Sequence, residues 1–484
     1  LVGRALGIVY YAVQVKLLSA PSQTAAGDLG QYIFAGIVLM YAGTIADWGL
    51  GTWLTREVAV RRHEADPHAA TRGLFAATLT VRLVLAVSGF AAMLLVALPG
   101  PLYGFFRLTP AGGTAIALLG LSLIPSAVSS AVTAVYNAYE RMGPPALIQV
   151  GTTLANAVLG IAALFLGWGA VGLAGAALVT TIVTAAIFTR LLIRDFFPPV
   201  LIWQPAQART MLSAAFPLMV NGLLIAIFFR FDQFLIEHYR PQDVAIYETA
   251  YKVINVTQII TPSVVLALFP AMARAAIDDR VALTRTYRGA VKLLLVLGLP
   301  LVAGTIVLAG PLITAITLGK EGYLPYSAWA LAILIVYLPL SFVNGVTQYV
   351  LIAVHRQGRL AWAIGATALF NVAANALVVP VWGIYGAAVV TVLSEVVLLV
   401  PFLGWTRAEL GPEAARPGPR ALKLAAAGTV LAILPAATLA VGAHPVLALT
   451  AGLLAYAAAL AGLGVLSPRE IALLRTFGRR GAAA

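Results

Sequence analysis

Apolar stretches of about twenty residues recur along almost the whole chain, with short polar connections between them. A helix of that length crosses the hydrocarbon core of a bilayer. Backbone groups inside lipid must be hydrogen-bonded within their own segment, so the spans should be helices. The pattern predicts an all-α polytopic membrane protein with about fourteen transmembrane helices. They are expected at residues 1–18, 30–54, 73–98, 112–136, 146–167, 170–192, 211–236, 244–270, 290–309, 327–354, 361–380, 384–405, 421–441 and 446–466.

The two halves of the chain repeat one another. When Arg141 is superposed on Arg356, Asn156 falls on Asn371, and further identities fall at equivalent places in the span pattern. Six predicted spans separate matching points, so both copies should share one orientation about an axis along the membrane normal. We therefore predict two homologous six-helix lobes and two appended helices with a basic tail. Their expected bounds are 1–205, 206–408 and 409–484.

Basic residues crowd one set of alternate loops, whereas the opposite loops hold only Arg107, Arg240 and Lys320. Lys and Arg in short loops are retained on the cytoplasmic side. We expect a multi-pass protein of the cytoplasmic (inner) membrane, with both termini in the cytoplasm. The same loops account for the net charge of +13 through attraction to anionic lipid headgroups, so nucleic-acid binding is not needed to explain it.

Composition removes several classes of site. The chain is 61% hydrophobic and 10% charged, and it has no cysteine, so disulfides and thiolate metal sites are excluded. Its five histidines lack ligand-like spacing, and no metal site is predicted. The phosphate-binding loop of ATPases is missing, which argues against ATP-driven pumping by this chain alone. No cofactor is expected, although a H⁺ or Na⁺ gradient could drive transport.

Charged residues inside the predicted spans carry most of the functional information. Each costs roughly 2.5 to 3.5 kcal/mol at a helix centre, so it should face a wet cavity or an opposite charge. Two matched lobes favour a substrate site at their interface, opened alternately to either side. The charges are Arg4, Lys16, Arg82, Arg230, Lys252, Asp47, Asp232, Glu248 and Glu395.

Some of these charges also have a purely structural explanation. Glu248 and Lys252 are four residues apart on one helix and could form an ion pair. Arg4 and Arg82 have no acidic partner nearby in sequence, and a bridge to Asp47 is the alternative to substrate binding.

For the remaining charges the same choice stays open. Arg230 and Asp232 should project to nearly opposite sides of their helix, one toward the cavity and the other toward a neighbour. Glu395 could carry a proton or make a packing hydrogen bond. Lys16 lies near a membrane end and is expected to snorkel to headgroups.

Aromatic residues are frequent in the first two predicted spans. They include Tyr11 and Trp48, whose rings could stack on sugars. Tyr and Trp also form the ordinary belt of membrane interfaces, which is the simpler interpretation for Tyr32 and Trp53.

Several short motifs resemble bacterial polysaccharide flippases. GDLGQY at residues 27–32 lies at the start of the second span. ADWGLG at 46–51 lies near its end, and Arg56-Glu57 comes after it. The resemblance continues to WGIYGAA at 382–388 and covers nearly the whole chain. These Wzx-type (O-antigen) flippases belong to the multidrug and oligosaccharidyl-lipid exporter superfamily, which has a MATE-like fold.

The resemblance implies that the chain moves a polyprenyl-(pyro)phosphate-linked oligosaccharide from the cytoplasmic to the outer leaflet. Arginine suits an anionic pyrophosphate in a partly desolvated cavity. We expect Arg4, Arg82, Arg230, Tyr11 and Trp48 to contact substrate. Asp47, Asp232 or Glu395 would couple transport to an ion or hold the arginines. The expected partners are the lipid-linked oligosaccharide and membrane lipids, with other polysaccharide-assembly membrane proteins as candidates, and the protein is expected to be a monomer.

Three other functions remain open. An ion-coupled multidrug antiporter of the same fold would need an acidic lumen, whereas five bases and four acids are present here. A membrane-embedded polysaccharide polymerase or ligase usually has a large outer loop with catalytic basic residues, and the outer loops here are short. A scaffold without transport activity gives no reason for nine intramembrane charges.

Overall fold

The structure is a computed structural model that describes residues 2–18, 27–61, 67–258, 260–412, 419–442 and 444–465. These residues form helices, turns and connections and no strand. Within them, ten helical segments are long and apolar enough to cross a membrane, and three shorter apolar helices accompany them. One of the ten, Gln357–Leu410, contains a kink and counts as two spans, which brings the total to fourteen. The predicted all-α membrane fold is confirmed.

By its contacts the chain divides into two compact units. The first comprises residues 1–252, 314–326 and 368–390, and the second comprises residues 253–313, 327–367 and 391–484. The lobe bounds expected from the repeat stay a prediction.

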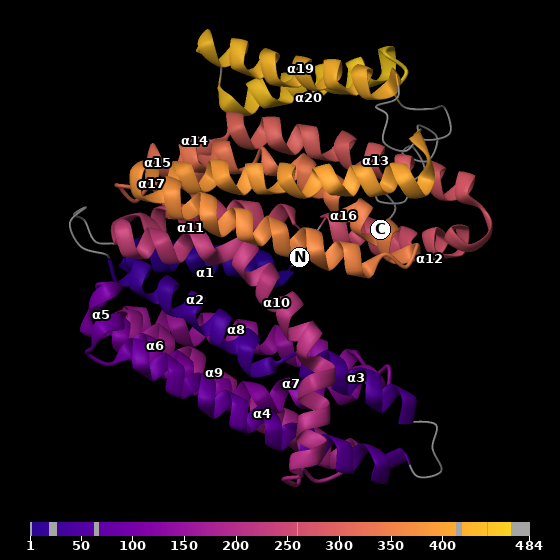
Figure 1. Ribbon diagram of the computed structural model, residues 1–484. Helices are drawn as coiled ribbons and strands as arrows, with labels where there is room; N and C mark the ends of the chain where they lie inside the picture. Colours follow the sequence, from indigo (N-terminus) through magenta and orange to yellow (C-terminus); the bar gives the residue numbers. More distant parts are fainter. Residues whose placement is uncertain are drawn as a thin grey trace. The chain divides into compact units, whose positions relative to one another are not determined.

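The first unit contains the helices of the N-terminal half (Figure 1). Phe75 and Tyr136 are fully buried in one of its apolar clusters, and Phe34 in another. Its elements are α1 (Val2–Leu18), α2 (Asp28–Asp47), α3 (Leu50–Arg61), α4 (Pro67–Ala97), α5 (Pro101–Phe105), α6 (Pro110–Leu121), α7 (Leu123–Ala138), α8 (Gly143–Phe165), α9 (Gly169–Asp195), α10 (Pro205–Tyr239), η1 (Pro241–Asp243), most of α11 (Val244–Thr257), the end of α14 (Ala309–Thr317) and part of α17 (Gln357–Leu410).

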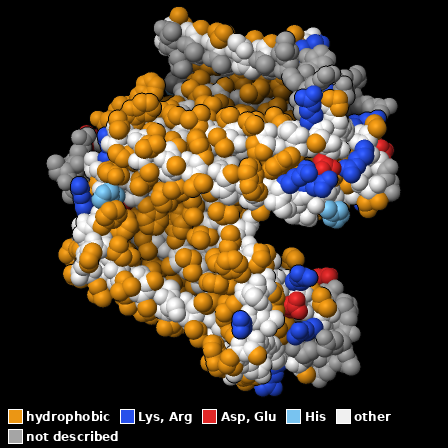
Figure 2. Space-filling model, viewed as in Figure 1, with side chains coloured by type: hydrophobic (Ala, Val, Ile, Leu, Met, Phe, Trp, Pro, Cys, Tyr) orange, Lys and Arg blue, Asp and Glu red, His pale blue; other side chains and the backbone are white. Residues whose placement is uncertain are grey.

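The second unit contains the remaining helices. Leu431 and Tyr456 lie in its apolar cluster, where α19 and α20 meet α13. Apolar side chains cover most of the visible face of the molecule, as expected for helices that lipid surrounds (Figure 2). The elements of this unit are the end of α11, α12 (Ile260–Asp278), α13 (Arg280–Val307), the beginning of α14, α15 (Tyr326–Leu334) from Ser327 onward, α16 (Tyr337–Ala353), the rest of α17, α19 (Pro419–Ala440) and α20 (Pro445–Gly462).

A break in the middle of the second span separates α2 from α3. Trp48 and Gly49 both have positive φ, 50° and 71°, and the Trp48 N–H closes the last turn of α2 on Thr44 and Ile45. A Cβ on Gly49 would lie 2.5 Å from Leu218 Cβ, so α10 packs directly on the break. The break leaves Asp47 at the carboxyl end of α2.

A second break divides α17. Gly383 has φ 56° and ψ −137°, which an L-residue rarely adopts. Arg240 lies against it, since a Cβ there would be 2.9 Å from Arg240 Cδ, and Arg240 Nη2 donates to Val381 O at 3.1 Å. The kink falls between the spans expected at 361–380 and 384–405.

Candidate functional site

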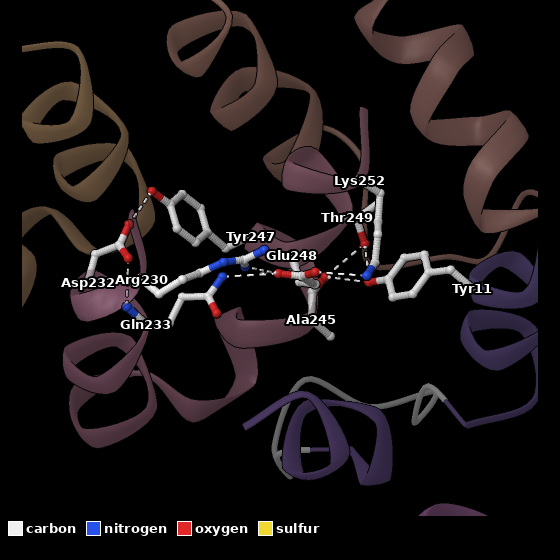
Figure 3. Close-up of polar contacts among 9 residues, drawn as sticks. All are labelled: Tyr11, Arg230, Asp232, Gln233, Ala245, Tyr247, Glu248, Thr249 and Lys252. Atoms are coloured by element: carbon white, nitrogen blue, oxygen red, sulfur yellow. Dashed lines mark hydrogen bonds and ion pairs between the residues drawn. The ribbon is translucent and has the colours of Figure 1, made fainter. Parts of the chain in front are cut away.

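The α10–α11 hairpin brings charged side chains of the two helices into contact. The η1 turn reverses the chain, so that the end of α10 lies beside the beginning of α11. Arg230 Nη1 lies 2.6 Å from Glu248 Oε2, and Lys252 Nζ lies 2.9 Å from Glu248 Oε1 (Figure 3). The ion pair expected between Glu248 and Lys252 is therefore present, and Arg230 shares the same carboxylate.

The two cations are more exposed than the acid between them. The side chains of Lys252 and Arg230 are 31% and 20% exposed, and that of Glu248 is 6% exposed. One carboxylate faces two positive charges, so the cluster of these three residues carries an excess positive charge. Gln233 fixes the carboxylate further by donating to Glu248 Oε2 at 3.1 Å.

Aromatic side chains flank this cluster. Lys252 Nζ lies 4.8 Å from the centre of the Tyr11 ring, and Arg230 Cζ lies 4.9 Å from that of Tyr251. The Tyr11 hydroxyl is hydrogen-bonded to Thr249 at 3.0 Å, which ties α1 to α11 (Figure 3). Cation–π contacts of this kind hold ammonium and guanidinium groups in place.

Asp232 is hydrogen-bonded to neighbouring residues of the same hairpin. Its side chain accepts from the Tyr247 hydroxyl at 2.7 Å and from the Gln233 backbone N–H at 2.9 Å. Arg230 and Asp232 were expected to face different ways, yet both contact residues of α11. Their partners, Glu248 and Tyr247, are adjacent residues of α11.

Asp47 and Arg82 form a second charged site, on α2 and α4. Arg82 Nη2 lies 2.5 Å from Asp47 Oδ1 and also contacts Ser130 Oγ. The Arg82 side chain is 2% exposed and that of Asp47 is 41% exposed. This bridge was the structural alternative for Arg82, and it leaves the carboxylate rather than the guanidinium accessible. Trp48, next to Asp47, donates its indole N–H to Leu212 O at 3.0 Å.

Glu395 belongs to the second unit and is buried there. Asn344 Nδ2 donates to Glu395 Oε2 at 2.6 Å and to its backbone oxygen at 2.9 Å. The packing hydrogen bond considered for this residue is present. Arg4 falls in α1, and its side chain lies outside the described part of the chain. Within that part, no three His, Asp or Glu side chains gather as a metal site would require.

Sequence reasoning missed a buried acid. Glu237 is fully buried and accepts from Gln31 Nε2 at 2.9 Å, and Gln31 Oε1 accepts from the Thr109 backbone N–H at 3.1 Å. The span was expected to end at residue 236, immediately before Glu237, whereas α10 continues to Tyr239. The spacing of Arg230, Gln233 and Glu237, three and four residues apart, was the available signal.

Two cavities meet at Asp47 within the first unit. The first, of about 620 Å³, is bounded by α2, α7 and α10 and includes Asn221 and Thr44. The second, of about 540 Å³, is bounded by α3, α7, α8 and α9. Both volumes fall in the range of small-molecule sites in proteins.

Comparisons with known proteins place this chain in a family. The family model described as "Polysaccharide biosynthesis protein" matches residues 1–276, and the MatE model matches residues 217–377. A search of curated protein sequences finds no match.

Solved structures share the fold. The lipid II flippase MurJ, in an inward closed conformation, is similar with a TM-score of 0.75 and 12% identity, over 94% of this chain and 96% of that one. An inward-facing multidrug resistance MATE family transporter of the MOP superfamily gives 0.63 and 18%, over 85% and 95%. MATE in complex with MaL6 gives 0.54 and 16%, over 86% and 94%. The fold is that of membrane transporters and flippases.

Proposed function

The chain belongs to the family of polysaccharide biosynthesis proteins, and from that membership we propose that it is a flippase for a lipid-linked oligosaccharide. The cargo is a polyprenyl (pyro)phosphate that carries sugars, and it moves from the cytoplasmic to the outer leaflet of the inner membrane. The lipid tail stays in the bilayer while the polar headgroup passes through the protein by alternating access. Both termini face the cytoplasm.

The observation that carries the proposal is the excess of positive charge in the cluster of Arg230, Glu248 and Lys252. Arg230 and Lys252 lie on either side of Glu248 and are more exposed than it is. A pyrophosphate is a multiply charged anion, and charge-assisted hydrogen bonds from such cations are among the strongest available. Glu248 holds the two cations in position before the anion arrives, which lowers the cost of organising the site.

The role of Arg82 differs in this proposal from that of Arg230. Its guanidinium is buried against Asp47, so it holds the carboxylate in place and is not the first group that an anion would meet. Tyr11 supports Lys252, and Trp48 anchors the break between α2 and α3.

The test is a flipping assay in proteoliposomes with a fluorescent polyprenyl-pyrophosphate oligosaccharide. Arg230→Ala and Lys252→Ala should each lower the flipping rate at least about tenfold, because a lost charged hydrogen bond is worth about 1.5–3 kcal/mol. Arg285→Ala, at an exposed position of α13, is the matched control and should keep the wild-type rate. Wild-type flipping in both hairpin variants would refute the assignment.

An ion-coupled antiporter is the second candidate, favoured by the buried carboxylates. Asp232, Glu237 and Glu395 are each 2% exposed or less. A carboxyl group that gains and loses a proton or Na⁺ in such a place could couple transport to a gradient. Uptake of a cationic dye into the same proteoliposomes, driven by a H⁺ or Na⁺ gradient, with no flipping of the lipid, would favour this function instead.

A further inference from the structure

The cavity bounded by α3, α7, α8 and α9 has an unusually polar wall for the interior of a membrane bundle. Nine of its fifteen lining residues carry a hydroxyl group, two carry an amide and one is Asp47. All fifteen belong to the first unit. Helix surfaces that face lipid are apolar, so a wall this polar indicates that the cavity holds a polar occupant.

The chain builds this wall from helical spacing. On α7, Ser126, Ser130, Thr133 and Asn137 follow one another at intervals of three and four residues, which places them on one face. The opposite faces of α7 carry buried apolar residues such as Val135. The polar side of an amphipathic helix inside the bundle is thus turned to the cavity.

Most of the hydroxyl hydrogens are already used. Ser130 donates to Ser126 O at 2.9 Å, Thr133 to Ser129 O at 2.8 Å and Thr181 to Ala177 O at 2.6 Å. Thr152 does the same with Ile148 O at 2.9 Å. A hydroxyl that has donated its hydrogen still has lone pairs. The wall therefore offers mainly hydrogen-bond acceptors, and it suits a ligand rich in donors.

Charge decides between a cation and a neutral donor. Arg82 lies behind the wall, paired with Asp47 and in contact with Ser130 Oγ, so the one carboxylate of the cavity is already neutralised. The Arg82 Nε and Nη1 atoms are buried and have no hydrogen-bond partner among the described residues. A free cation would be repelled by this guanidinium. A neutral molecule with several O–H or N–H groups would not.

We propose that this cavity is a saccharide subsite, in which sugar hydroxyls donate to the Ser and Thr oxygens and to Asp47. Phe188 lines the same cavity and supplies an apolar surface for the C–H face of a sugar ring. Asn137 and Gln149 add donors and acceptors for ring oxygens and acetamido groups. The inference rests on the proposed function, since the sugar would be that of the lipid-linked cargo.

The first experiment measures binding of free disaccharides that carry neither lipid nor phosphate. The full chain in nanodiscs is titrated with maltose, lactose and N,N′-diacetylchitobiose, followed by saturation-transfer NMR. The double variant Thr133→Val with Thr181→Val removes two acceptors while keeping side-chain shape. It should weaken binding of the best disaccharide about tenfold, the loss expected for two hydrogen bonds.

The matched control is the double variant Thr153→Val with Thr189→Val. Both residues make the same bond to the carbonyl four residues back, on α8 and α9, and neither lines the cavity. It should bind like the wild type. Equal affinity in both double variants, or no disaccharide binding to the wild type, overturns the subsite. So does selective binding of tetraphenylphosphonium, which would make the cavity a cation site.

A second measurement does not depend on removing hydroxyls. The chain has no cysteine, so Ser129→Cys introduces a unique thiol in the cavity and Thr189→Cys one outside it. Saturating disaccharide should slow maleimide labelling of the first at least about threefold and leave the second unchanged. Equal labelling rates with and without sugar at Ser129→Cys overturn the proposal.

Failure of the subsite and failure of the flippase can be told apart. If the Thr133 and Thr181 variant flips the lipid-linked cargo at the wild-type rate and binds free sugar normally, the subsite is wrong and the flippase stands. If the wild type binds sugar through these residues but flips no lipid-linked oligosaccharide, the subsite stands and the flippase is wrong.

Discussion

At the scale of single residues, the contribution of a charged side chain depends on its partners and on its burial. Glu248 is nearly inaccessible and faces Arg230 and Lys252, whereas Glu57 forms a partly exposed pair with Arg61 one helical turn away. The same type of contact differs in strength because water screens the carboxylate of Glu57 more than that of Glu248.

Replacing Glu248 should therefore be costly. Glu248→Ala leaves two partly buried cations without their shared counter-charge, and we expect a loss of about 3 kcal/mol in unfolding free energy. Glu57→Ala, the control, should cost less than about 1 kcal/mol. Thermal unfolding in detergent, followed by circular dichroism, measures both. Equal destabilisation by the two variants would contradict the difference in burial.

Arg82 and Asp47 should depend on each other. Asp47→Asn leaves the buried guanidinium of Arg82 without a counter-charge, so adding Arg82→Gln to it should recover part of the lost stability, by about 1 kcal/mol or more. The comparison is a double-mutant cycle of thermal midpoints. Strictly additive effects would mean that the bridge contributes nothing beyond its separate residues.

At the scale of elements, two glycines determine where spans bend. Gly49 ends α2 and Gly383 divides α17, and both have a left-handed backbone with another side chain packed against them. Breaks inside transmembrane helices need such contacts, because the freed backbone groups and the gap beside them must be filled by neighbouring helices.

Gly49→Ala should destabilise the protein strongly. Its φ of 71° is unfavourable for alanine, and the new Cβ would lie 2.5 Å from Leu218 Cβ and 3.0 Å from Ala215 O. We expect a loss of about 2 kcal/mol or more. Gly73→Ala on α4, where the added methyl group would meet no atom within 4 Å, should be neutral or stabilising. Thermal unfolding of the two variants decides the matter, and similar midpoints would show that the break tolerates a side chain.

For the whole molecule, the distribution of basic loops predicts a topology that can be measured. Unique thiols introduced as Arg141→Cys and Arg356→Cys should react with an impermeant maleimide only from the cytoplasmic side. Lys320→Cys should react only from the outside. Intact cells and inverted vesicles provide the two sides, and labelling of all three positions from one side would overturn the orientation.

The membrane fold and the number of spans could be predicted from the sequence because twenty-residue apolar segments have few alternatives in lipid. The charged residues could also be identified, since each is costly in a bilayer. Their partners could not all be predicted. Glu248 and Lys252 share a helix, but the contact of Glu248 with Arg230 needs the turn between α10 and α11.

The hydroxyl-lined cavity escaped prediction for a related reason. Ser and Thr are common in membrane helices, where bonding to the carbonyl four residues back satisfies them. Only packing of α3, α7, α8 and α9 shows that they share one wall. Glu237 was not predicted because the expected span ended at residue 236, although its partner Gln31 lay within another expected span.

The sequence by itself determined that the chain crosses the membrane about fourteen times and which costly charges it carries there, because hydropathy and charge are local properties. Tertiary structure alone decided which side of each pair is accessible. Arg82 is buried behind Asp47, while Arg230 and Lys252 cover Glu248. Such exposure depends on side chains from distant helices, and no local pattern encodes it.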